Sequence, residues 1–145
     1  MALTTVSNNA LSNITTIPAS IPTGALTLIK SITASSSASI SFVDGTDGVV
    51  LDDTYQSYVF KFIDIHPQND GVKFQFQTDT GTNTNYNQTI TSTTFYAFHS
   101  ESGASSSLSY DGSYDQAQGT SFQDLIFYQG NDADQQCSGI LQLFN

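Results

Sequence analysis

Residues 55–77, YQSYVFKFIDIHPQNDGVKFQFQ, contain the two most strongly patterned segments of the chain. Within 72–77 apolar and polar side chains alternate at every position, which is the period-two pattern of a strand with one buried face. Within 55–66 apolar side chains point to both sides, which is typical of a central strand covered on both faces. Pro67 and the Asp-Gly pair at 70–71 separate the two segments, so the sequence predicts that they form a β-hairpin.

Weaker strand patterns lie on both sides of this pair. Upstream, 26–32 and 38–43 each place most of their apolar residues on one face, and two Asp-Gly pairs in 44–48 indicate a turn after them. Downstream, the polar stretches 78–87 and 101–121 are expected to be loops. The remaining segments are rich in β-branched, aromatic and aliphatic residues, and they predict strands at 89–100, 122–129 and 138–144.

About seven strands separated by turns, with few helix-forming residues, favour an all-β chain. The expected fold is an antiparallel β-sandwich of the jelly-roll kind over residues 24–145. Residues 1–23 lack a sustained period and contain two prolines, so they are expected to form an extended N-terminal arm. An untethered terminus is one interpretation of this arm, and a docking arm that orders against a partner is the other. The candidate anchors for docking are Leu11, Ile14, Ile17 and Ile21.

The composition excludes several classes of protein. The chain has three Lys, no Arg, 12 Asp and one Glu, for a net charge of −10, so it lacks the basic surface that nucleic-acid binding requires. No run of about 18 apolar residues is present, so no membrane span is expected. The single cysteine, Cys137, rules out an internal disulfide and a cysteine-based zinc site.

The acidic residues and the two histidines do not form a motif with chemical meaning. The aspartates occur in turns, where their side chains cap the backbone, and their spacing does not match a calcium-binding loop. His66 and His99 each end an expected strand, with no nucleophile or carboxylate at a diagnostic spacing. The sequence therefore predicts no catalytic residue, no cofactor and no metal site, and the chain is expected not to be an enzyme.

The loops 78–87 and 101–119 have the composition of a recognition surface. They place tyrosines beside small polar residues, and tyrosine supplies rigid contact area at a low entropic cost. A solvated or partner-packed loop is the alternative interpretation. The candidate contacts to a glycan or a protein partner are Asn85, Tyr86, Tyr110, Asp111, Tyr114 and Asp115.

Four segments carry a family resemblance: LIKSITASSSASISF (28–42), YQSYVFKFIDIHP (55–67), VKFQFQTDTG (72–81) and SGILQLFN (138–145). Their order resembles bacteriophage virion structural proteins that are common in phages of marine bacteria and are described as tail-fibre or virion proteins. In that family further strands follow the one resembling 138–145. The resemblance therefore implies that the sandwich here lacks its C-terminal strands, although a true terminus paired inside a sheet stays open.

The resemblance implies a non-enzymatic virion protein, a tail-fibre or head-decoration component. Such a protein would be assembled in the bacterial cytoplasm, would contact other virion proteins and would form homo-oligomers. The alternative is a carbohydrate- or host-receptor-binding module that uses loops 78–87 and 101–119 to bind a host surface glycan. Both hypotheses predict no contact with nucleic acid or membrane.

Overall fold

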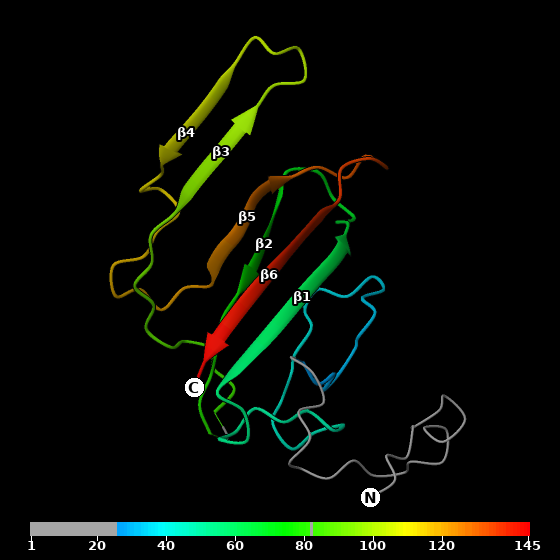
Figure 1. Ribbon diagram of the computed structural model, residues 1–145, viewed down its shortest axis with the longest axis vertical. Coiled ribbons are helices and arrows are strands. Elements are labelled where there is room, and N and C mark those ends of the chain that lie inside the picture. Colours follow the sequence, from blue (N-terminus) through cyan, green and yellow to red (C-terminus); the bar gives the residue numbers. More distant parts are fainter. Residues whose placement is uncertain (1–25, 82) are drawn as a thin grey trace, which may run out of the picture. The chain divides into compact units, whose positions relative to one another are not determined.

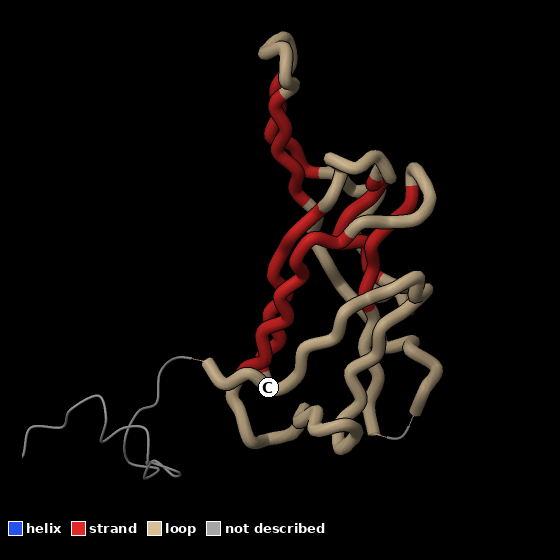
Figure 2. The backbone as a smooth tube through the Cα atoms, turned by 90° about the vertical axis from the view of Figure 1, so that its right-hand side faces the viewer, coloured by secondary structure: helices blue, strands red, loops and turns tan. Residues whose placement is uncertain are grey.

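The computed structural model describes residues 26–81 and 83–145 (Figures 1 and 2). Among these residues there are six strands, all paired antiparallel, and no helix, so the prediction of an all-β chain is confirmed. The expected N-terminal arm and its candidate anchors lie outside the described residues and stay predictions.

The six strands form three pairs. β1 (Ser57–Ile65) pairs with β6 (Cys137–Phe144), β2 (Val72–Phe76) with β5 (Gln123–Gln129), and β3 (Phe95–His99) with β4 (Ser106–Tyr110). Figure 1 shows the β1–β6 pair in green and red. The pairing is nested, with the first strand joined to the last and the innermost two joined to each other.

The chain divides into two compact units. One unit is Ser57–Phe144, which contains all six strands, and the other comprises the described residues before Ser57 together with Asn145. The expected sandwich over residues 24–145 stays a prediction.

The strands expected at 26–32 and 38–43 are wrong, because these segments have no strand structure. Neither segment has a backbone-paired partner strand among the described residues, and Leu28 is 81% exposed. An alternating pattern stabilises a strand only where a neighbouring strand takes up its hydrogen bonds. The turn expected at 44–48 is confirmed, and the next residue, Val49, is the buried apolar residue of this unit.

β1 is amphipathic instead of covered on both faces. Tyr58 is 8% exposed and Phe60 is half-buried, whereas Ile63 on the other face is 75% exposed. The register with β6 shifts between Phe62 and Ile65, because the chain bulges at Asp64, whose φ is 55°. Because β1 has β6 as its one strand partner among the described residues and leaves Ile63 exposed, the expectation of a central strand buried on both faces is wrong.

The expected hairpin between β1 and β2 is also wrong, because each strand pairs elsewhere. The chain does turn at 66–71, and Gly71 has the positive φ of 66° that favours glycine. After the turn, however, β1 and β2 meet through side chains: the rings of Phe62 and Phe74 pack edge to face, with centroids 4.9 Å apart. Turn residues reverse the chain without specifying whether the two strands then share backbone bonds or side-chain contacts.

β4 lies inside the segment that the sequence predicts as a loop. Its residues, SSLSY, are poor in strand-forming side chains, so pairing with β3 must supply the stability. The β3–β4 register is uninterrupted from Phe95 opposite Tyr110 to His99 opposite Ser106. The strand expected at 89–100 is correspondingly shorter, whereas β2, β5 and β6 lie close to their predicted positions.

Candidate functional site

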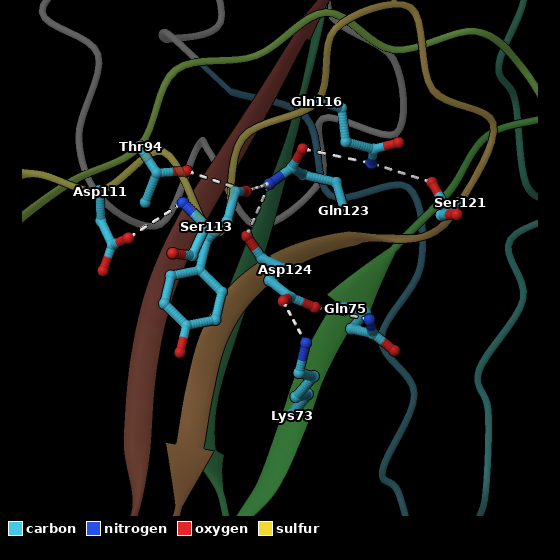
Figure 3. A network of polar contacts seen from close by, with 10 residues as sticks. Lys73, Gln75, Thr94, Asp111, Ser113, Gln116, Ser121, Gln123 and Asp124 are labelled. Carbon is cyan, nitrogen blue, oxygen red and sulfur yellow. Dashed lines mark hydrogen bonds and ion pairs between the residues drawn. The ribbon is translucent and has the colours of Figure 1, made fainter.

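A buried glutamine ties the loop 111–122 to the start of β5 (Figure 3). Gln123 is 6% exposed, and its Nε2 donates to the carbonyl oxygens of Tyr114, at 2.9 Å, and Asp124, at 3.1 Å. Its Oε1 accepts from the hydroxyl of Ser92 at 2.6 Å. A buried amide whose donors and acceptor are all engaged holds its neighbours in one arrangement, so the loop has a defined position.

Asp124 binds two side chains of the neighbouring strand β2. Lys73 Nζ lies 2.6 Å from Oδ2 of Asp124, and Gln75 Nε2 donates to Oδ1 at 2.5 Å. The Asp124 side chain is 10% exposed and that of Lys73 is 51% exposed. The hydrogen bond to Asp124 raises the pKa of Lys73, because it stabilises the charged form of the amine.

The ring of Tyr114 has two ring contacts. It stacks on Phe127 with centroids 4.0 Å apart and planes 13° apart, and Lys73 Nζ lies 5.5 Å from its centroid. The first contact is an aromatic stack and the second has cation–π geometry. Together they present an ordered aromatic ring beside the Lys73–Asp124 ion pair.

Tyr114, Lys73 and Asp124 border a cleft of about 310 Å³. This volume is near the lower limit for small-molecule sites, which begin at roughly 300 Å³. Phe122, at the edge of the cleft, is 49% exposed. The lining combines aromatic rings, carboxylates, amides, hydroxyls and one amine: Lys73, Gln75, Ser113, Tyr114, Asp115, Gln116, Ser121, Phe122 and Asp124.

Gln116 is held against the wall of this cleft. Its backbone N–H donates to the Ser92 hydroxyl at 2.9 Å and its Nε2 donates to the carbonyl of Ser121 at 3.0 Å. Its Oε1 is buried and accepts no hydrogen bond from the described residues. A side chain on Gly119 would collide with this oxygen, so glycine at 119 allows Gln116 to approach the backbone.

The structure brings two of the predicted contact residues, Tyr114 and Asp115, into the cleft. Tyr110 lies beside them, because its hydroxyl donates to Oδ2 of Asp115, and this bond raises the pKa of Tyr110. Asp111 closes a local turn by accepting from the Ser113 N–H at 3.0 Å. The structure therefore places Tyr114 and Asp115 in the cleft, with Tyr110 and Asp111 next to them in contact and in sequence.

Asn85 and Tyr86 do not line this cleft and belong to the loop after β2. Asp79 organises that loop, because its carboxylate accepts from the backbone N–H of Tyr86 at 2.8 Å and of Thr80 at 2.9 Å. The Tyr86 bond is the main cause of the lowered pKa of Asp79.

Acid is therefore expected to release the Tyr86 amide. Because the pKa of Asp79 is lower in the folded chain, its bonds stabilise the fold above the ordinary Asp pKa of about 3.9. That stabilisation is lost as the pH falls through the lowered value. In an NMR titration the Tyr86 amide proton should shift with a midpoint below about 3.9, and the shift should vanish in Asp79→Asn. A midpoint at or above that value would contradict the assignment.

Seven of the nine lining residues were not among the contacts predicted from the sequence. Lys73 and Gln75 are the outward-facing members of the alternating segment 72–77, so their exposure was predictable although their partner Asp124 was not. Gln116 and Phe122 lie in or beside the expected loop and carry no pattern that singles them out.

The two histidines and the cysteine lie outside this site. A ring nitrogen of His66 is 2.8 Å from the carbonyl oxygen of Asp132, and burial raises the pKa of the Cys137 thiol. Within 26–81 and 83–145, no three His, Cys, Asp or Glu side chains are grouped as metal ligands would be. Over the same ranges, no helix has the length and apolar character to cross a membrane.

Comparison of the chain with known protein families, curated proteins and solved structures finds no match.

Proposed function

We propose that the chain is a non-enzymatic structural component of a bacteriophage virion, of the tail-fibre or head-decoration kind, that assembles with copies of itself and with other virion proteins. The resemblance of 28–42, 55–67, 72–81 and 138–145 to such proteins supports this function. The net charge of −10 favours an outer position in the particle, away from packaged DNA. Assembly would take place in the bacterial cytoplasm.

The fold that accompanies this proposal is a jelly-roll-like β-sandwich. Nested pairing of β1 with β6, β2 with β5 and β3 with β4 is the pairing expected when one long antiparallel hairpin folds over on itself. Side-chain contacts between pairs support two facing layers. Phe62 of β1 packs on Phe74 of β2, and Tyr96 of β3 packs on Phe127 of β5.

Uncovered apolar side chains on the strands are the observation that carries the assembly proposal. Strand residues 70–79% exposed include Ile63, Leu108, Ile140 and Phe144, whereas Tyr58 is the one apolar residue under 9% exposed among the described residues of Ser57–Phe144. Exposed aliphatic and aromatic residues in such numbers are typical of surfaces that a partner covers. A structural protein whose exposed apolar residues are covered in an assembly accounts for them.

Gradient-purified particles of the phage that encodes the chain test this proposal. An antiserum against the chain is expected to detect it in the particles at a constant ratio to the major capsid protein. Its presence in the lysate but not in washed particles would contradict a virion role. The same particles dissociated into tails and heads would distinguish a fibre from a decoration protein.

A second candidate function, binding of a host surface glycan, is favoured by the cleft beside Tyr114. Aromatic rings can stack on the apolar face of a sugar, while carboxylates and amides bind its hydroxyls. The cleft offers Phe122, half-exposed, beside Gln75 and Asp124. Its two carboxylates already accept from Lys73 and Tyr110, which favours binding over acid–base catalysis.

Thermal unfolding with dextran, mannan and galactan tests glycan binding. A ligand at one hundred times its Kd stabilises the folded chain by about 2.7 kcal/mol, which raises the midpoint by several degrees. Phe122→Ala should abolish the rise, whereas Phe144→Ala, which removes an aromatic ring 79% exposed on β6, should leave it intact. Equal shifts in both variants, or none in the wild type, would contradict the assignment.

A further inference from the structure

The two faces of the β3–β4 hairpin differ. On one face the ring of Tyr96 contacts Phe127 of β5, with centroids 6.5 Å apart. The register places Phe95, Ala97, Leu108 and Tyr110 on the other face, with His99 and Ser106 at its end nearest the turn, and we call the first four residues the outer hairpin face. Of these, Phe95 is 69%, Leu108 79% and Tyr110 55% exposed.

The hairpin is also the least charged strand pair of the chain. Between Phe95 and Tyr110 there is one acidic residue, Glu101, and no lysine, although the whole chain carries 13 acidic residues. Glu101 lies in the turn beyond the paired residues. Two copies of a chain with a net charge of −10 repel each other. They can therefore approach most closely where the surface has few charges, as it does on the β3–β4 hairpin.

An isolated two-stranded ribbon is at best marginally stable in water. Within the described residues neither β3 nor β4 has a second strand partner. The ring of Phe95 packs on that of Tyr110 with centroids 6.1 Å apart, which orders the outer hairpin face across its width. A second apolar layer over this face would supply the burial that the hairpin lacks on that side.

We propose that the outer hairpin face packs against the same face of a second copy of this chain. The inference rests on the proposed function and names the surface through which the copies meet. A face that packs on itself across a two-fold axis needs only one self-complementary patch. The row of Phe95, Ala97, Leu108 and Tyr110, which contains no charged side chain, offers such a patch.

Light scattering of the full chain after gel filtration tests the proposal. The wild type should have a mass at least twice the 15.6 kDa of one chain. Leu108→Asp places a carboxylate in the centre of the outer hairpin face and should return the mass to that of one chain. Ser107→Asp is the matched control, because it adds the same charge at the neighbouring exposed position on the opposite face, and it should leave the mass unchanged.

Hydrogen exchange gives a second measurement that does not require a variant. Amides of residues 95–110 should become more protected as the protein concentration rises, while those of β2 should not. A wild type with the mass of one chain and no concentration-dependent protection would overturn the proposal. An oligomer that survives Leu108→Asp would also overturn it and would leave the wider assembly proposal standing. Absence of the chain from purified virions would instead refute the proposed function.

Discussion

A Gln123→Glu variant is expected to be about 3 kcal/mol less stable than the wild type at pH 7 and close to it at pH 4. The substitution keeps the shape of the side chain but replaces the Nε2 donor with oxygen. That oxygen would face the carbonyl oxygens of Tyr114 and Asp124, which now accept hydrogen bonds at 2.9 and 3.1 Å. With Gln123 only 6% exposed, water cannot relieve the repulsion.

The direction of the pH dependence follows from the protonation of the introduced carboxyl. Burial and two facing carbonyl oxygens favour its neutral form, so its pKa in the folded chain rises above the value of about 4.3 in the unfolded chain. Below about pH 4.3 both states hold the proton and the penalty is small. As the pH rises toward the folded-state pKa the unfolded chain releases its proton first, so stability falls and then levels off.

Urea unfolding followed by tyrosine fluorescence at pH 4, 5, 6 and 7 measures this effect against the wild type at each pH. Gln142→Glu is the control, because it adds the same charge at an exposed glutamine of β6. Its difference from the wild type should stay within about 0.5 kcal/mol at every pH. A parallel loss of stability in both variants would show that net charge, and not the buried amide, determines the result.

The strands that the sequence predicts well are those with the strictest local patterns. β2 keeps the alternation expected for 72–77, with Val72, Phe74 and Phe76 half-buried and Lys73 and Gln75 exposed. β5 and β6 also lie where β-branched and aromatic residues concentrate. A period of two is a property of neighbouring residues, so it can be recognised without knowing the rest of the fold.

Strand partners depend on distant residues, and here prediction fails. The Asp-Gly turn after Pro67 gives the same local signal for a hairpin as for a turn that joins strands of different pairs. In β4 a strand was missed. Its serine-rich sequence predicts a loop, and the segment is a strand because it pairs with β3. Its one local signal is the alternation of Leu108 and Tyr110 with serine.

The cleft was predictable only in part, for a related reason. Tyrosine beside small polar residues singles out Tyr114 from composition alone. The residues that complete the cleft are brought together by the pairing of β2 with β5, which places Lys73 and Gln75 against Asp124. A site formed across two strands separated by some fifty residues cannot be recognised before their pairing is known.

The second large effect is expected for Phe127→Ala, which should reduce stability by about 2–3 kcal/mol. Phe127 is half-buried in β5, and it stacks on Tyr114 at 4.0 Å while packing edge to face on Tyr96 of β3. The substitution removes both contacts, so β3 and the loop 111–122 each lose their ring contact with β5. The near-ultraviolet circular dichroism of tyrosine should decrease, because Tyr114 no longer stacks on a ring.

Tyr128→Ala is the matched control for this substitution. It removes an aromatic ring from the next position of β5, but that ring is 78% exposed, so the loss should stay below about 1 kcal/mol. Phe127→Leu keeps most of the volume and removes the stacking, and should fall between Phe127→Ala and the wild type. Equal losses in the Phe127→Ala and Tyr128→Ala variants would mean that the Tyr114 stack contributes little.

If the cleft binds glycans, Phe127→Ala should also weaken binding at temperatures where the chain is still folded, since the ring that fixes Tyr114 is then missing.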